Sequence, residues 1–246
     1  MQKTACQYGN RRLSIRGHRL KVAVLQFPGS NCDQDALKSL REDVGVSAEY
    51  VWHDESSLNG FDAVFIPGGF TYGDYLRCGA IASRSAIMQE AIRFASEGRP
   101  VIGACNGFQI LAESGLLPGA LLRNKNQKFI CEDVFLAAGT RRSMWTQGVD
   151  RVIRIPIAHG EGRYFIDEDG LKSIQDNEQI AFRYVNAQGS ATDEANVNGS
   201  LENIAGVINK EGNVLGLMPH PERATKALLG GTDGMLIMNA LTLVNA

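Results

Sequence analysis

The sequence predicts an α/β fold with an open, mostly parallel sheet covered by helices on both faces, and a second half rich in antiparallel strands. In the first half, near-continuous apolar runs alternate with segments of helical periodicity, and glycine, proline or small polar residues break the runs. Because strand–helix alternation requires crossover connections, these strands should be parallel. In the second half, five strand-like runs are separated by polar, glycine-rich loops.

The first strand is expected at 21–27, an apolar run typical of a parallel strand that is buried on both faces. A helix follows from Asp33, with apolar residues at helical spacing, and ends at Gly45 as a C-cap. The next two strands are expected at 48–53 and 61–66, and the second of these stops at a Pro-Gly-Gly break.

A helix that stops at Gly98 comes next, and a short strand at 100–104 runs directly into a cysteine and a helix at 106–114. Ligands of parallel sheets bind beyond the carboxyl ends of the strands. We therefore expect the site at the two sharpest breaks, after Ile66 and after Ala104. The apolar face of the helix before Gly98 is marked by Ile81, Met88, Ile92 and Ala95.

The second half begins with strands and ends with a helix that we expect at 235–244. The turn at 210–212 is expected to join the last two strands as a hairpin. We expect one domain over 20–246, because no linker or repeat divides the chain. The predicted strands are 129–136, 152–158, 180–185, 204–209 and 214–218.

The composition is that of an ordinary globular protein, and it excludes several classes of function. The 246 residues are 44% hydrophobic and 21% charged, with a net charge of −2. This balance gives no field that would attract nucleic acid or a membrane surface. No run approaches the roughly 18 uninterrupted apolar residues of a membrane span.

Cysteine usage and the first residues bear on location. The five cysteines are dispersed without a CxxC pair, which is typical of reduced thiols in a cytoplasmic protein. Residues 1–19 hold five basic and no acidic residues and lack the apolar segment of a secretory signal. We interpret them as a basic extension, either disordered or the result of a start site assigned too far upstream.

The strongest local signal is Gly103-Ala104-Cys105-Asn106-Gly107, which has the form Gly-x-nucleophile-x-Gly between a predicted strand and a predicted helix. Such a turn crowds the backbone, and the two glycines relieve the crowding because they carry no Cβ. The thiol of Cys105 would stand at the first turn of a helix, where the helix dipole favours a thiolate. The alternative is a buried cysteine beside glycines that only a tight turn requires.

A thiol nucleophile needs a base, and the base needs an orienting acceptor. Two histidines have a carboxylate two residues on: His159 with Glu161, and His220 with Glu222. In an extended segment these positions point to the same side. Pro221 restricts the second pair, which also follows a predicted strand. The pattern favours His220 but leaves His159 open.

A third part of such a site would stabilise the tetrahedral oxyanion. The Gly68-Gly69 break can bring backbone N–H groups close to a substrate, and the N–H of Asn106 is next to the nucleophile. The sequence has no Gly-x4-Gly-Lys-Ser/Thr loop, no GxGxxG opening a helix and no HExxH. We therefore expect no metal, nucleotide or other cofactor in this chain.

The Gly68-Gly69 pair, the elbow around Cys105 and the segment His220-Pro221-Glu222 form a set that resembles the class I glutamine amidotransferases. Elbows of that family have the form Gly-x-Cys-x-Gly-x-Gln, and Gln109 fits the last position. The resemblance begins near Leu20 and is more specific to the glutaminase subunits that serve purine biosynthesis. It is carried by VAVLQFPGSNCD (22–33), PGGFTYGDYLRCG (67–79), GACNGFQ (103–109), AHGEGRY (158–164), YVN (184–186), NGS (198–200) and GNVLGLMPHPERA (212–224).

The resemblance implies a flavodoxin-like fold and makes His159 a feature of the subgroup, not the catalytic base. Val197 departs from the pattern, because the family commonly has proline there, but it matches no catalytic position. The implied roles are Cys105 as nucleophile, His220 as general acid and base, Glu222 as its orienting partner, Gly69 and Asn106 as oxyanion donors, and Gln109 near the amino-acid end of glutamine.

Glutamine is the implied substrate, and its ammonia would pass to a separate synthetase subunit that uses ATP and Mg²⁺. A small third subunit would bridge the two, as is usual in bacterial systems of this type. Two other functions stay open on the sequence. Another cysteine hydrolase or a redox sensor could use the same elbow, although Gln109 and the His-Pro-Glu segment weigh against it. A catalytically silent regulatory subunit would be expected to lack at least one of Cys105, His220 and Glu222.

Overall fold

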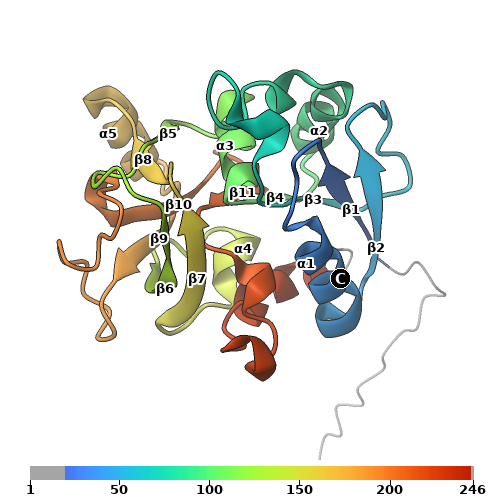
Figure 1. Ribbon diagram of the computed structural model, residues 1–246. Helices are drawn as coiled ribbons and strands as arrows, with labels where there is room; N and C mark the ends of the chain where they lie inside the picture. Colours follow the sequence, from blue (N-terminus) through green and yellow to red (C-terminus); the bar gives the residue numbers. More distant parts are fainter. Residues whose placement is uncertain (1–19, 245–246) are drawn as a thin grey trace, which may run out of the picture.

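Nine strands form one continuous sheet in the computed structural model, which describes residues 20–244 (Figure 1). The strand order is β2-β1-β3-β4-β11-β10-β9-β6-β7. Neighbours from β2 to β11 are parallel, and neighbours from β11 to β7 are antiparallel. The predicted parallel half and antiparallel half are therefore confirmed. The strands are β1 (Lys21–Gln26), β2 (Ser47–Trp52), β3 (Ala63–Ile66), β4 (Val101–Ala104), β6 (Ile130–Ala138), β7 (Ile153–His159), β9 (Ile180–Val185), β10 (Ile204–Ile208) and β11 (Val214–Leu217).

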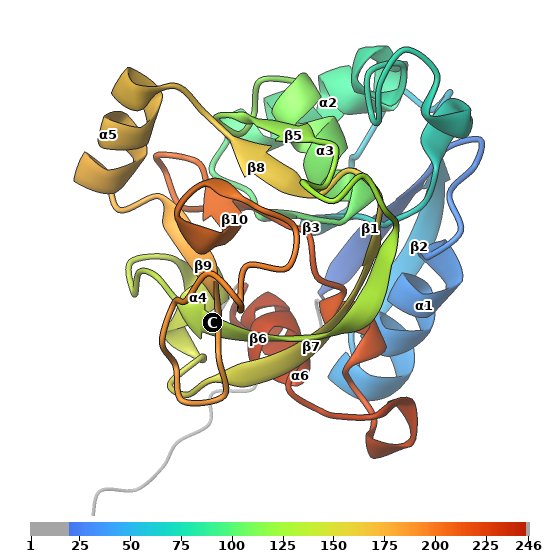
Figure 2. The same cartoon turned by 60° about the vertical axis from the view of Figure 1, so that its left-hand side comes forward.

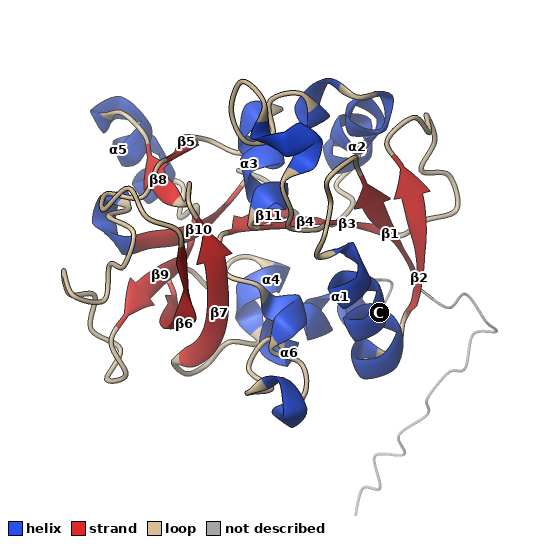
Figure 3. Ribbon diagram, viewed as in Figure 1, coloured by secondary structure: helices blue, strands red, loops and turns tan. Residues whose placement is uncertain are grey.

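Helices cover both faces of this sheet (Figures 1 and 3). Side chains of α2 and α3 belong to one buried cluster, and those of α1, α4 and α6 belong to the other. A second, two-stranded antiparallel sheet pairs β5 (Ala120–Leu122) with β8 (Arg163–Phe165), and it lies beside α3 (Figure 2). The helices are α1 (Asp33–Lys38), α2 (Ala86–Ser96), α3 (Asn106–Glu113), α4 (Met144–Gln147), α5 (Glu168–Asp176) and α6 (Met235–Met238).

Successive residues of the central strands alternate between the two clusters, because side chains along a strand point to opposite faces. Ala63 and Phe65 of β3 pack on the side of α4 and α6, while Val64 and Ile66 pack on the side of α2 and α3. All four are fully buried. Burial on both faces explains why the sequence of this strand is continuously apolar.

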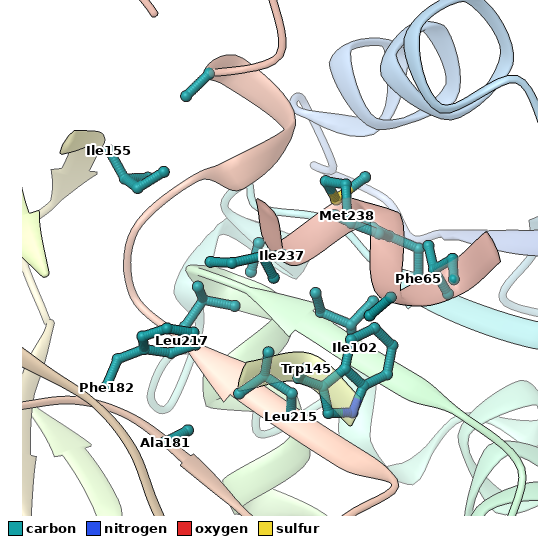
Figure 4. Packing of buried hydrophobic residues seen from close by; sticks show 14 of the residues in the cluster. Phe65, Ile102, Trp145, Ile155, Ala181, Phe182, Leu215, Leu217, Ile237 and Met238 are labelled. Carbon is teal, nitrogen blue, oxygen red and sulfur yellow. The ribbon is translucent and has the colours of Figure 1, made fainter. Parts of the chain in front are cut away.

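The cluster beneath α4 and α6 is centred on the indole of Trp145 (Figure 4). Trp145 packs in the same cluster as Ile102 of β4, Leu215 of β11 and Ile237 of α6. Its ring N–H donates to the carbonyl of Asn213 at 3.1 Å. The one polar atom of this large side chain is thus satisfied inside the core.

Strand ends lie within about two residues of those that the sequence predicts, a difference of the size that boundary definitions alone produce. The first helix ends at Gly45 as predicted, after a π-helical turn at 39–44 that continues α1. Gly45 has φ 78°, the left-handed conformation of a glycine C-cap.

Two predicted helices are shorter than expected. The helix that should include Ile81 begins only at Ala86, because Ser85 is extended and its hydroxyl accepts a backbone N–H of the first turn. Ile81 lies before this cap and is 36% exposed, so its assignment to the apolar face is wrong. The closing helix is α6, and a 3₁₀ turn continues it to Leu243.

Within residues 20–244, no helix is long and apolar enough to cross a membrane. The four cysteines of this range form no disulfide. The basic extension expected at 1–19 lies outside the described residues.

Gly107 sets how closely α3 approaches β3, since a Cβ added there would lie 2.0 Å from the carbonyl oxygen of Ile66. We expect Gly107→Ala to lower the free energy of unfolding by about 1–3 kcal/mol, the range for overpacked sites. Urea denaturation of the chain measures this change. Gly231→Ala is the control, because nothing lies within 4 Å of its Cβ position, and its effect should stay within about 0.5 kcal/mol. Equal losses in both variants would contradict the packing.

Candidate active site

A cavity of about 250 Å³ opens beyond the carboxyl ends of β3 and β4, at the two breaks where the sequence analysis expects a site. Gly69, Cys105, Gln109 and His159 are among its lining residues. A smaller cavity of about 120 Å³ adjoins it at Gly69 and Cys105 and reaches His220. The expected nucleophile therefore faces both spaces.

Cys105 occupies a sharp turn between β4 and α3, with φ 51° and ψ −108°. A non-glycine residue rarely adopts a positive φ, and such residues cluster at functional sites. The backbone N–H of Cys105 donates to the carbonyl of Leu217 in β11 at 2.8 Å, which holds the turn in place. A Cβ on Gly103 would lie 2.6 Å from the backbone of Gly107, so the elbow requires glycine, as the sequence analysis expects.

His220 and Glu222 follow the end of β11 and form a buried pair. The Nδ1 of His220 and the Oε1 of Glu222 are 2.7 Å apart, and each residue is 1% exposed. The backbone N–H of His220 donates to the carbonyl of Pro156 in β7, which fixes the segment against the neighbouring strand. A carboxylate on Nδ1 orients the ring and leaves Nε2 as the nitrogen that can meet a substrate or a nucleophile.

Gly68 shows that the imidazole and the nucleophile are neighbours. A Cβ added to Gly68 would lie 2.7 Å from Cε1 of His220 and 3.3 Å from Cβ of Cys105. Both side chains therefore pack against the same glycine. The structure brings together Cys105, His220 and Glu222, the three residues on which the sequence analysis places the chemistry.

The electrostatic surroundings favour a protonated His220. Burial lowers the pKa of its imidazole, but the negative charges of Glu222 and Cys105, with hydrogen bonds from two thiols, outweigh burial and raise the pKa well above its ordinary value. Nε2 is buried and has no hydrogen-bond partner of normal geometry among the described residues. A proton held there is available to a group that enters the site.

His159 has different surroundings, and it does not pair with Glu161 as the i, i+2 spacing allows. Its Nδ1 lies 3.1 Å from Oδ1 of Asn124, while the amide nitrogen of Asn124 donates to the carbonyls of Lys128 and His159. Asn124 Oδ1 is therefore an acceptor, and Nδ1 of His159 carries the proton. Burial, assisted by the charge of His220, lowers the pKa of His159 to about 4.

The other expected residues also lie around the cavity. Asn106 is in the first turn of α3, where backbone N–H groups have no partner within the helix. Its side-chain amide donates to Oε1 of Gln109 at 2.8 Å, and Gln109 Nε2 donates to the carbonyl of Glu161 at 2.6 Å. Gln109 thus connects α3 to the loop after β7. Gly69 has φ 153°, and Cα of Ser30 lies 2.8 Å from its Cβ position, which leaves no room for a side chain.

The sequence analysis did not single out Cys32 and Arg223, which line the smaller cavity with His220. The Cys32 thiol donates to Asn31 at 3.3 Å and accepts from Arg223 Nη2 at 3.2 Å. Cys32 follows β1, so the rule on carboxyl strand ends could have placed it here. Ligand atoms of Cys32, His220 and Glu222 lie within 4.8 Å of one another, but the last two already bind each other.

Comparison with known proteins gives the family. CobB/CobQ-like glutamine amidotransferase domains match residues 19–230. The phosphoribosylformylglycinamidine synthase subunit PurQ of Chlorobaculum parvum is 53% identical over 224 residues, which are 90% of this chain and 89% of that protein. The chain belongs to the PurQ family of glutamine amidotransferases.

Solved structures of PurQ-type and other amidotransferases share this fold. A chain in the PurLQS structure from Thermotoga maritima is 44% identical, with a TM-score of 0.81 over 92% of this chain and 99% of that one. A GMP synthase protein from Thermoplasma acidophilum is 17% identical, with a TM-score of 0.57 over 93% and 96%. A glutamine amidotransferase from T. maritima is 18% identical, with a TM-score of 0.53 over 85% and 79%. These last two show the fold alone.

The buried His159 should make this PurQ family member sensitive to acid. Below an ordinary histidine pKa of about 6.5 the unfolded chain gains a proton at this residue, while the folded chain stays neutral there until about pH 4. Stability from this residue is therefore present above pH 6.5 and lost as the pH falls, by up to about 3 kcal/mol. His159→Gln should reduce the fall in unfolding free energy between pH 6.5 and 4, measured with urea. An NMR titration that places the pKa of His159 near 6.5 would contradict this.

Proposed function

We propose that this chain is the glutaminase subunit of phosphoribosylformylglycinamidine synthase and hydrolyses glutamine to glutamate and ammonia. The observation that carries the proposal is the buried set of Cys105, His220 and Glu222, which β4 and β11 present at one edge of the sheet. It occurs in a chain that is 53% identical to a PurQ protein over 90% of its length.

In the first step, the thiolate of Cys105 attacks the carboxamide carbon of glutamine and forms a C–S bond. The carbonyl oxygen becomes an oxyanion, and backbone N–H groups of Gly69 and Asn106 are positioned on either side of the nucleophile to receive it. The helix dipole of α3 also favours negative charge at its first turn. Gln109 contributes by fixing the loop that forms the opposite wall.

In the second step, the C–N bond breaks as His220 gives its proton to the departing nitrogen, which leaves as ammonia. The raised pKa of His220 supports this role, because the proton is already present when glutamine binds. The now neutral imidazole takes a proton from water, and the resulting hydroxide attacks the γ-glutamyl thioester. Glutamate leaves, and the thiolate and the imidazolium are restored.

The ammonia is used by partner subunits. We propose that a synthetase subunit of the PurL type uses ATP and Mg²⁺ to convert formylglycinamide ribonucleotide to the amidine, and that a small PurS-type subunit bridges the two. The T. maritima structure that this chain resembles is described as PurLQS. We propose no cofactor in this chain itself. The reaction belongs in the cytoplasm, a compartment that keeps thiols such as Cys105 reduced.

Cys105→Ala should abolish glutamine-dependent synthesis by the reconstituted complex and leave ammonia-dependent synthesis unchanged, because only the first requires the thioester. The rates of amidine formation with glutamine and with ammonium chloride measure this difference. Cys131→Ala is the control, since this exposed thiol lies outside both cavities, and it should keep both activities. Equal loss of both activities in Cys105→Ala would count against the proposed role.

Gly68→Ala should weaken glutamine hydrolysis without removing any reacting group. The added Cβ would collide with the His220 ring and must shift it relative to Cys105. A misplacement of about 1 Å can cost about 10²-fold in rate, so we expect a fall of this order in kcat with glutamine. Ammonia-dependent synthesis should be unchanged. A variant with wild-type kcat would show that this contact does not position the imidazole.

A further inference from the structure

The cavity in front of Cys105 has an acidic wall that the mechanism above does not use. Asp74, from the loop after β3, and Glu161, from the loop after β7, both line it. Cys78 lies between them, and its thiol donates to Oε2 of Glu161 at 3.3 Å. Oδ1 of Asp74 is buried and has no hydrogen-bond partner among the described residues. Burial raises the pKa of Asp74, and the nearby charge of Glu161 adds to this effect.

His159 adds a third acceptor to the same cavity. The residue is 3% exposed and lines the cavity, and its Nε2 is buried without a partner in the described part of the chain. Because Asn124 fixes the proton on Nδ1, Nε2 presents a lone pair. A buried nitrogen of this kind calls for a donor from outside the chain.

Asp74, Glu161 and His159 offer only acceptors, because the one thiol hydrogen between the carboxylates is already donated to Glu161. Two like charges in a partly buried site repel each other, and a cation between them removes the repulsion. A primary ammonium group supplies both the charge and three N–H donors. The chemistry of this wall therefore fits an alkylammonium ligand better than an anion or a neutral amide.

Cationic groups lie elsewhere on the lining of the same cavity. Lys128 and Arg123 both line it, and Arg123 is exposed and lies 3.4 Å from Glu161. A ligand that carries an ammonium and a carboxylate on one carbon can meet both kinds of charge. Cys105 lines the same cavity, so the side chain of an amino acid held in this way can extend to the thiol.

The loop that carries Asp74 is held in a strained conformation. Tyr72, Asp74 and Leu76 have φ of 53°, 56° and 70°, in the left-handed region that side chains disfavour. Strain of this kind persists only where the surrounding structure imposes it, and it is common at ligand-binding segments. The loop thus keeps the Asp74 carboxylate on the cavity wall at a cost in backbone energy.

We propose that Asp74 and Glu161 bind the α-ammonium group of the glutamine whose carboxamide reaches Cys105, with Nε2 of His159 as a further acceptor. This inference rests on the proposed function. It makes the two carboxylates specificity residues, which select an α-amino acid amide over a simple carboxylic acid amide. They take no part in the bond changes at the carboxamide.

The test compares glutamine with 4-carbamoylbutanoate, which has the same carboxamide, chain and carboxylate but no amino group. In the reconstituted complex, the KM for glutamine and the inhibition constant of 4-carbamoylbutanoate against glutamine are measured for wild type, Asp74→Asn and Glu161→Gln. Glu49→Gln is the matched control, because it removes one carboxylate from β2 at the far edge of the sheet. Ammonia-dependent synthesis reports whether each complex is intact.

We expect Glu161→Gln and Asp74→Asn each to raise the KM for glutamine by about 10–100-fold, the range for a lost charged hydrogen bond. The inhibition constant of 4-carbamoylbutanoate should stay the same, so the preference for glutamine over the deamino compound disappears. Glu49→Gln should change neither value. Ammonia-dependent synthesis should be unchanged in all variants.

Equal weakening of both compounds would overturn the proposal, because it would indicate a structural role for the carboxylates. An unchanged KM for glutamine would place the ammonium group elsewhere and would also overturn it. Both results require a wild-type complex that uses glutamine. A wild-type complex that forms amidine from ammonia but releases no glutamate would instead refute the proposed function, and the two failures are therefore distinguishable.

Discussion

The close contact of β3, β4 and α3 is the constraint on which the rest of the site depends. Gly103 and Gly107 let the chain reverse around Cys105, and Gly107 lets α3 lie directly on the carbonyl of Ile66. The bond from the Cys105 N–H to Leu217 then ties this turn to β11. The positions of the nucleophile, the first turn of α3 and the histidine beyond β11 all follow from this packing.

Two buried histidines lie near each other in this framework and are held in opposite charge states. His220 has a carboxylate on Nδ1, so its charged form is stabilised in spite of burial. His159 has only the amide of Asn124, so burial keeps it neutral, and the charge of His220 adds to this effect. One ring therefore stores a proton and the other stores a lone pair. Sequence spacing could not separate them, because each has a glutamate two residues on.

The sequence was sufficient for features that depend on neighbours along the chain. The long apolar strands, the glycine cap at Gly45 and the elbow at Cys105 all have local patterns. β5 and β8 have three residues each, too few for a period, and α5 buries only Ile174, so its apolar stripe is too narrow to recognise. The contacts of Cys32 with Arg223 and of Cys78 with Glu161 join residues 191 and 83 positions apart. Only the folded chain brings such pairs together.

The place of β11 has a consequence for how the molecule can be divided. This strand pairs in parallel with β4 on one side and antiparallel with β10 on the other, so it is the seam between the two halves of the sheet. The nucleophile is carried by the first half, while the histidine arrives from β11 only after the chain has built the second. Neither half alone can therefore carry a primitive version of the site. The two must have been inherited as one unit, and shuffling of modules within this fold is expected to leave that seam intact.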